Sequence, residues 1–116
     1  MFSFKFISRF FSSLAIGKKR PTKDISHNPI IRCVDGFEVS VQAHPFSYSQ
    51  RNTKGKLITV ECGFPTWVPG TSQFRNYAEL CGTDDYTETV YPYMPIEVVE
   101  AELAIHGGIV DGCLPS

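Results

Sequence analysis

The sequence lacks the patterns by which many small enzymes and metal proteins are identified. Its 116 residues contain no GxxxxGK(S/T), GxGxxG, GxSxG or HExxH motif, which removes the usual P-loop, dinucleotide-binding, α/β-hydrolase and zinc-peptidase signatures. The four cysteines are separated by 29, 19 and 32 positions and form no CxxC pair, so a zinc site is not predicted. We therefore expect no metal and no other cofactor, and we assign no catalytic residue.

An export signal is not predicted either. The basic cluster Lys18, Lys19 and Arg20 lies where small residues should precede a signal-peptidase cleavage site. No Asn-x-Ser/Thr glycosylation site is present either. The cysteines are therefore expected to be free thiols in a reducing cytoplasm.

Long uninterrupted hydrophobic runs are absent too. The segment 1–16, MFSFKFISRFFSSLAI, is rich in phenylalanine but is interrupted by Lys5 and Arg9. A helix of this length reaches about 24 Å, which is short of the roughly 30 Å hydrocarbon core of a bilayer. A membrane span is therefore not predicted.

Residues 1–16 instead predict an amphipathic basic helix. On a helical projection, Lys5 and Arg9 lie opposite a broad apolar arc. A helix of this kind can lie in a membrane interface or dock into a groove of a partner protein. Alternatively, it packs on the chain's own core or on a second subunit. The apolar arc consists of Phe4, Phe6, Ile7, Phe10, Phe11, Leu14 and Ala15.

Charge is divided unevenly along the chain. The first 23 positions contain six basic residues and no acidic one, whereas positions 24–116 contain five basic and twelve acidic residues. The net charge of −1 thus divides into +6 and −7. An acidic body repels phosphate backbones, so nucleic acid is not expected as its partner. Residues 17–28 are polar and predict a linker between the basic arm and the body.

The clearest local prediction is a β-hairpin over residues 30–43. Asp35-Gly36 separates two β-favouring runs, and this dipeptide favours a type I′ turn. In the second run, apolar and polar residues alternate, which is typical of a strand with one buried face. The residues predicted to face the core are Phe37, Val39, Val41 and Ala43.

The rest of the body predicts a small α+β domain over residues 29–110. Pro95 suits the first position of a C-terminal helix that Gly107 ends, with Ile96, Val99 and Leu103 on its buried side. We expect an antiparallel sheet of three to five strands, covered on one face by this helix. The remaining predictions are a surface loop at 44–55, a strand at 57–62, a short helix at 71–80, a strand at 87–91 and a frayed tail at 111–116.

One hypothesis for a reactive site rests on Cys62. This cysteine ends a predicted strand, and His44 or His106 is a candidate base for it. Cysteine is among the most frequently buried residues, so a core thiol is the alternative. His106 at the end of a helix has a structural explanation in the helix dipole.

Aromatic side chains are the most prominent feature of the body. Tyrosine and tryptophan are enriched at binding hot spots, and here they lie among prolines and glycines. The alternative is that half of them complete the core. Loops commonly carry binding residues, so His44 and Tyr48 in the predicted loop 44–55 are candidates as well. The candidate binding residues are His44, Tyr48, Trp67, Phe74, Tyr77, Tyr91 and Tyr93.

Several short motifs, taken in order, resemble a family of small uncharacterised bacteriophage proteins. They are DGFEVSVQA at 35–43, VECGFP at 60–65, NYAE at 76–79, TETVYPYMPIEVVE at 87–100 and HGGI at 106–109. The resemblance covers about residues 30–109, whereas the loop 44–50 and the arm depart from it. It implies a phage accessory protein in the host cytoplasm and brings no catalytic residues.

The hypothesis that follows is a non-enzymatic module that binds a host or phage protein. Its N-terminal helix would serve as a docking element, or would hold the protein peripherally at the inner membrane. The first alternative is a small enzyme or ligand-binding protein that uses Cys62 and His44. The second is a structural protein that forms a homo-oligomer through the phenylalanine face.

Overall fold

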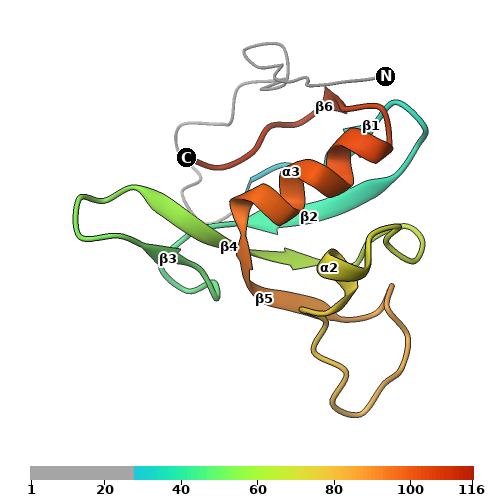
Figure 1. Ribbon diagram of the computed structural model, residues 1–116, viewed down its shortest axis with the longest axis horizontal. Helices are drawn as coiled ribbons and strands as arrows, with labels where there is room; N and C mark the ends of the chain where they lie inside the picture. Colours follow the sequence, from blue (N-terminus) through green and yellow to red (C-terminus); the bar gives the residue numbers. More distant parts are fainter. Residues whose placement is uncertain (1–27) are drawn as a thin grey trace.

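A computed structural model describes residues 28–116, and the predicted arm and most of the predicted linker lie outside this range. The described part is an α+β domain with a six-stranded antiparallel sheet and two helices (Figure 1). The α+β class was predicted, but the sheet has more strands than the expected three to five. The elements are β1 (Ile31–Cys33), β2 (Glu38–Gln42), β3 (Gln50–Arg51), β4 (Leu57–Gly63), α2 (Ser72–Arg75), β5 (Val90–Pro95), α3 (Ile96–Ile105) and β6 (Ile109–Asp111).

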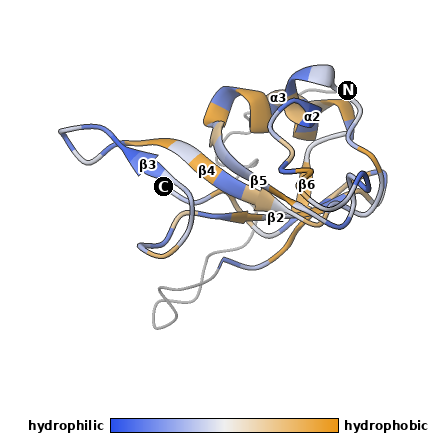
Figure 2. Ribbon diagram, turned by 90° about the horizontal axis from the view of Figure 1, so that it is seen from below, coloured by the Kyte–Doolittle hydropathy of each residue, from blue (hydrophilic) through white to orange (hydrophobic). Residues whose placement is uncertain are grey.

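Strand β4 is the centre of the sheet. It pairs with β2 through residues 61–63, with β3 through residues 57–59, and with β5. The sheet continues from β2 to β1 and from β1 to β6, so its order is β3-β4-β2-β1-β6, with β5 paired to β4. Figure 2 shows hydrophobic and hydrophilic residues alternating along β4, and a hydrophilic turn between β3 and β4. This alternation separates a core face of the sheet from an outer face.

The predicted hairpin is present as β1 and β2, but its turn is not of type I′. Asp35 is not among the described non-glycine residues with positive φ. The N–H of Gly36 donates to the carbonyl of Cys33 at 3.0 Å, and only Gly36 of this turn has a positive φ, at 98°. This pattern is that of a type I turn followed by a G1 bulge. The Asp35 carboxylate favours it by accepting a hydrogen bond from the Phe37 N–H at 2.9 Å.

The hydrophobic core is built from residues of both the sheet and the helices. Phe37, Val39 and Val41 are buried as predicted, and Ala43 is partly buried against them. Helix α3 contacts β4 and β5 and contributes Val99 and Leu103 to the same cluster. The other buried members of this cluster are Ile31, Cys33, Leu57, Val60, Cys62, Phe74, Tyr91 and Met94.

The helix expected over residues 71–80 is a single turn, α2. The Thr71 hydroxyl caps it by accepting a hydrogen bond from the Phe74 N–H at 3.2 Å. The chain then leaves the helix, and the Glu79 N–H donates to the carbonyl of Val90 at 2.9 Å. Pairing with the sheet therefore replaces the further turns of helix.

Strand β5 begins three residues later than the strand predicted at 87–91. The Asp85 carboxylate accepts hydrogen bonds from the Thr87 N–H and hydroxyl at 2.9 and 2.7 Å, which holds the preceding residues in a turn. Prolines at positions 92 and 95 are tolerated because β5 pairs with β4 alone.

The tail is packed, contrary to the expected fraying. Residues 109–111 form β6, and Cys113 beyond them is buried. Gly112 has a φ of 85°, and a Cβ at this position would lie 2.7 Å from the carbonyl oxygen of Ile30. The chain therefore passes so close to β1 that only glycine fits.

Candidate functional site

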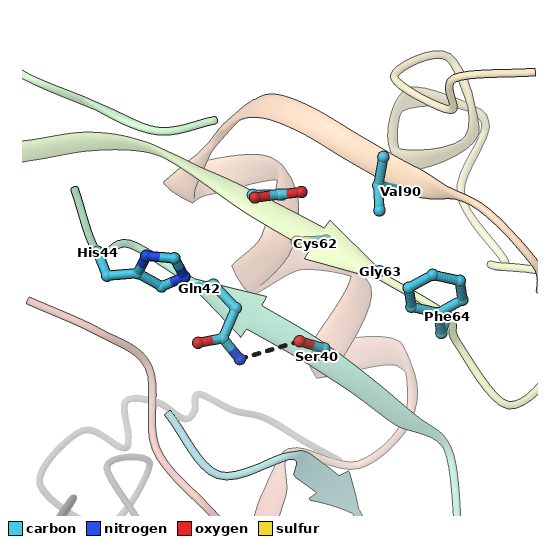
Figure 3. Close-up of a pocket in the computed structure, with 8 residues that line it drawn as sticks. Ser40, Gln42, His44, Cys62, Gly63, Phe64 and Val90 are labelled. Atoms are coloured by element: carbon cyan, nitrogen blue, oxygen red, sulfur yellow. Dashed lines mark hydrogen bonds between the residues drawn. The ribbon is translucent and has the colours of Figure 1, made fainter. Parts of the chain in front are cut away.

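A shallow groove runs along the outer face of the sheet, over β2 and β4 (Figure 3). Ser40 and Gln42 of β2 and Glu61 of β4 face this groove because alternate residues of a strand point to opposite faces. Their neighbours Val41 and Cys62 pair with each other and are buried. The groove encloses about 210 Å³, and its lining consists of Ser40, Gln42, His44, Glu61, Cys62, Gly63, Phe64 and Val90.

The amide of Gln42 organises the floor of the groove. Its oxygen accepts a hydrogen bond from the Asn28 N–H at 2.8 Å, and its nitrogen donates to the Asn28 carbonyl at 3.1 Å. The same nitrogen donates to the Ser40 hydroxyl at 2.9 Å, which Figure 3 shows as a dashed line. Gln42 therefore anchors the start of the described chain and fixes the side chain beside it.

The loop between β2 and β3 forms one end of the groove. His44 lies beside Gln42 in Figure 3, and its Nδ1 accepts a hydrogen bond from the Phe46 N–H at 3.2 Å. The Glu61 carboxylate accepts a hydrogen bond from the Tyr48 N–H at 3.0 Å. The loop is thus fastened across the outer face of β4, while the Phe46 side chain is 90% exposed.

A β-bulge places Tyr93 on the same side as this loop. The β4–β5 register shifts between Val60 and Cys62, and Tyr93 has a φ of 53°. The Tyr93 N–H donates to the Tyr48 carbonyl at 3.0 Å, and the two rings lie 5.7 Å apart. Bulges commonly redirect a side chain beside a functional site. Here the bulge leaves the Tyr93 ring 46% exposed.

Phe64 occupies the other end of the groove, near Val90 (Figure 3). Its φ is 53° and its side chain is 59% exposed. Within residues 28–116, Phe64 and Tyr93 are the only non-glycine residues with a positive φ. This conformation costs of order 1–3 kcal/mol for such a residue and is concentrated at functional sites. Two exposed aromatic rings are thus held in strained backbone conformations, one in the lining and one beside the loop that closes the groove.

The structure does not support Cys62 as a nucleophile. Its side chain belongs to the buried core, and burial, with a smaller contribution from Glu61, raises the pKa of the thiol far above its ordinary value. A protonated thiol without solvent access does not attack a substrate. His44 lines the same groove, but it has no thiolate there to activate.

The predicted aromatic residues do not form one exposed patch. Phe74 and Tyr91 are core residues whose rings lie 5.0 Å apart. Trp67 and Tyr77 are partly exposed, and Trp67 packs edge-on against Phe37 at 5.7 Å. Of the predicted binding residues, the structure brings together His44, Tyr48 and Tyr93, to which Phe46, Glu61 and Phe64 are now added.

A buried charge network was missed by the sequence analysis. Nε2 of His106 lies 2.7 Å from the Glu102 carboxylate, and Nδ1 lies 2.7 Å from the Asp35 carboxylate. Glu102 is fully buried and also accepts hydrogen bonds from the N–H groups of Gly70 and Thr71 at 2.7 and 2.9 Å. The i,i+4 spacing of the glutamate and histidine on a predicted helix was the signal available.

Hydrogen bonding controls the protonation of this network. Burial raises the pKa of Glu102, but hydrogen bonds from His106, Gly70 and Thr71 outweigh it and lower the pKa below its ordinary value. Burial likewise lowers the pKa of His106, but the hydrogen bonds to Glu102 and Asp35 outweigh it and raise the pKa. The favoured state is an imidazolium between two carboxylates. Both ring nitrogens are occupied, so the network acts as a structural clamp.

Neither a metal site nor a membrane span is found in the part of the chain that the structure describes. No group of three or more His, Cys, Asp or Glu there is arranged to hold a metal ion. No helix between residues 28 and 116 is long and apolar enough to cross a membrane. No family model, curated protein or solved structure matches the chain. The site is therefore interpreted from its geometry, and the resemblance to phage proteins stays a prediction.

Proposed function

We propose that the protein is a non-enzymatic module that binds a polypeptide partner in the groove over β2 and β4. The observation that carries this proposal is the placement of Phe64 and Tyr93, the two strained and exposed aromatic residues. A strained backbone conformation at an exposed side chain does not stabilise the fold. A role in binding is therefore the physical reason why Phe64 and Tyr93 have a positive φ. Tyrosine and other aromatic residues supply much of the binding energy of protein interfaces.

The size and chemistry of the groove favour a protein partner over a small molecule. Its volume of about 210 Å³ is below the roughly 300–1,000 Å³ of typical small-molecule sites. The floor offers the Ser40 hydroxyl and the Glu61 carboxylate, while Phe46, Tyr48 and Tyr93 extend the apolar surface beyond it. One bulky side chain of a partner would fill the groove, and the neighbouring rings would cover the flanking residues.

The wider setting of this module belongs to the same proposal. The motifs that resemble phage proteins support a role as a phage accessory protein whose partner is a host or phage protein in the host cytoplasm. Residues 1–16 would form an N-terminal amphipathic helix that acts as a docking element. Helix α3 would cover one face of the sheet, which its buried Val99 and Leu103 support.

Photo-crosslinking of the full-length protein tests the proposal. A photoreactive phenylalanine analogue at position 46 lies beside the groove and should crosslink one host protein in a bacterial lysate. The substitutions Phe64→Gly and Tyr93→Gly should each abolish this crosslink while the domain stays folded. Val110→Ser, at an exposed position on β6, is the control and should retain it. A crosslink that survives both glycine substitutions would contradict the proposal.

A further inference from the structure

A second exposed apolar surface lies at the end of the domain that contains His106. It is formed by Val34, Trp67, Val68 and Ile105, whose exposed fractions lie between 43% and 64%, and we call it the end patch. These residues come from the β1–β2 turn, from the segment before α2 and from the last residue of α3. None of them lines the groove described above.

Close contacts around His106 hold the end patch together. The Trp67 and His106 rings lie 6.0 Å apart. Val34 lies against Gly107, since a Cβ added at Gly107 would be 2.7 Å from the valine Cβ. Ile105 lies against Gly70, since a Cβ added at Gly70 would be 2.6 Å from the isoleucine Cδ1. Val34, Trp67 and Ile105 therefore lie around one charge network and belong to a single surface, to which Val68 is joined as the exposed neighbour of Trp67 in the chain.

We propose that residues 1–16 of the same chain dock their apolar arc on the end patch. An amphipathic helix suits such a surface, because its phenylalanine and leucine side chains would remove the exposed tryptophan, valines and isoleucine from water. Lys5 and Arg9 lie on the opposite side of the predicted helix and would stay in solvent. This proposal is independent of the groove and of its partner.

Charge complementarity supports this occupant. Residues 28–116 contain five basic and eleven acidic residues, whereas residues 1–23 contain six basic and no acidic ones. Glu97 and Ala101 are exposed and precede Ile105 at intervals of four residues, so they extend the patch along α3. Glu97 thus offers a carboxylate to Lys18, Lys19 or Arg20, the basic residues that directly follow the arm.

The length of the connecting segment permits the contact. Eleven residues, 17–27, separate the arm from Asn28 and span at most about 36–40 Å. The longest dimension of the domain is 38 Å. Val34 follows Asn28 by six residues along β1, a distance of about 20 Å in extended chain. The end patch is therefore within reach of the arm of the same molecule.

Fluorescence of Trp67 tests the docking directly, because it is the only tryptophan of the chain. In the full-length protein, acrylamide should quench Trp67 weakly. In the double variant Phe6→Ser/Phe10→Ser, quenching should become stronger and the emission maximum should shift to longer wavelength. Phe2→Ser, outside the apolar arc, is the matched control and should change neither. Equal quenching of the wild-type protein and the double variant would overturn the proposal.

Two further measurements distinguish docking on the same molecule from docking on a second copy or binding of the arm to a lipid surface. Protection of Trp67 should not depend on protein concentration, whereas protection that is lost on dilution would show that a second copy supplies the arm and would overturn the proposal. Vesicles of phosphatidylglycerol and phosphatidylethanolamine should leave the protection intact. Loss of protection with the vesicles would show that the arm prefers the lipid surface and would likewise count against it.

Trypsin cleavage after Lys5 and Arg9 provides a readout on the patch side. Ile105→Ser should accelerate this cleavage about tenfold, because loss of one buried isoleucine contact shifts the docking equilibrium by about that factor. Val110→Ser, at an exposed valine outside the patch, should leave the cleavage rate unchanged. Unchanged cleavage in the Ile105→Ser variant would contradict docking at this surface.

Discussion

His106 and Glu102 form a buried ion pair one helical turn apart, with Nε2 and Oε2 separated by 2.7 Å. The other ring nitrogen contacts Asp35 in the β1–β2 turn, and the Phe37 ring stacks on the imidazole at 3.9 Å with the two planes inclined by 3°. Through Glu102, the pair also binds the segment before α2. This ion pair thus connects three parts of the fold that are distant in sequence.

Stability should decline as the pH rises above 6.5, the ordinary pKa of the His106 side chain. The pKa of His106 is raised in the folded state, so its contribution is complete below the ordinary value of 6.5 and is lost as the pH rises through the folded-state pKa. The pKa of Glu102 is lowered, so its contribution is lost on acidification below the ordinary value of 4.5. Urea unfolding between pH 4 and 9 should show a maximum between these values. His106→Gln should flatten the alkaline decline.

Substitution of Glu102 should be strongly destabilising. Glu102→Gln leaves His106 and the Thr71 N–H with a weaker partner inside the core, and breaking a buried pair costs about 3–5 kcal/mol. Glu97→Gln on the exposed side of α3 should change the free energy of unfolding by less than about 0.5 kcal/mol. Urea denaturation of both variants makes the comparison. Equal effects would show that the clamp contributes nothing to stability.

Gly112 and Gly55 offer a matched pair for measuring steric crowding. Both have a positive φ, at 85° and 84°, but only Gly112 lies against backbone, since nothing is within 4 Å of a Cβ at Gly55. Gly55→Ala should cost about 1 kcal/mol from its φ alone. Gly112→Ala should cost at least about 2 kcal/mol more, because β6 must move away from β1. Thermal unfolding measures both, and similar losses would contradict the close approach.

One cysteine of the four should react rapidly in the folded protein. Cys81 is exposed, whereas the other three are buried, and burial together with the nearby Asp35 and Glu102 raises the pKa of Cys33 to about 12. Labelling with Ellman's reagent should give one fast equivalent in buffer and four in denaturant. Cys81→Ser should remove the fast phase. A fast phase that remains would show that Cys62 or another buried thiol is accessible.

Replacement of Phe64 by glycine should not lower stability. The ring is mostly exposed, and glycine adopts a φ of 53° without the penalty of about 1 kcal/mol that a Cβ brings. The free energy of unfolding should therefore stay constant or rise slightly. Val110→Gly removes an exposed side chain with an ordinary strand φ and should lower it by about 0.5–1 kcal/mol. A comparable loss in both variants would show that Phe64 is not strained.

Local sequence patterns correctly predicted the elements whose conformation depends on residues close to one another in the sequence. The alternation from Phe37 to Ala43 gave a hairpin with the correct buried face, and Pro95 and Gly107 bracketed α3. Asp35-Gly36 predicted the turn but not its type, because the Asp35 carboxylate binds the Phe37 N–H and keeps the aspartate out of the left-handed region. Turn chemistry of this kind depends on one hydrogen bond.

The groove and the charge network depend on contacts between distant segments, which periodicity does not encode. Tyr93 lies beyond the strand predicted at 87–91, and only the pairing of β5 with β4, whose register shifts between Val60 and Cys62, reveals the bulge there. Periodicity indicated Ile96, Val99 and Leu103 on the buried side of α3 and gave no signal for Glu102. Its burial is made favourable by hydrogen bonds from residues 70 and 71 and by His106, which also contacts the β1–β2 turn. Tyr91 and Phe74 became core residues for the same reason, since two separate elements bring their rings together.

The pairing of β1 with β6 has a consequence for synthesis. These are the first and the last strands of the described domain, and Arg32 lies opposite Asp111. On the ribosome, β1 emerges early but lacks this neighbour until nearly the whole domain has been translated and has left the exit tunnel. The sheet is therefore completed only after β6 has left the exit tunnel, and the edge of β1 that β6 later covers stays open to chaperones until then.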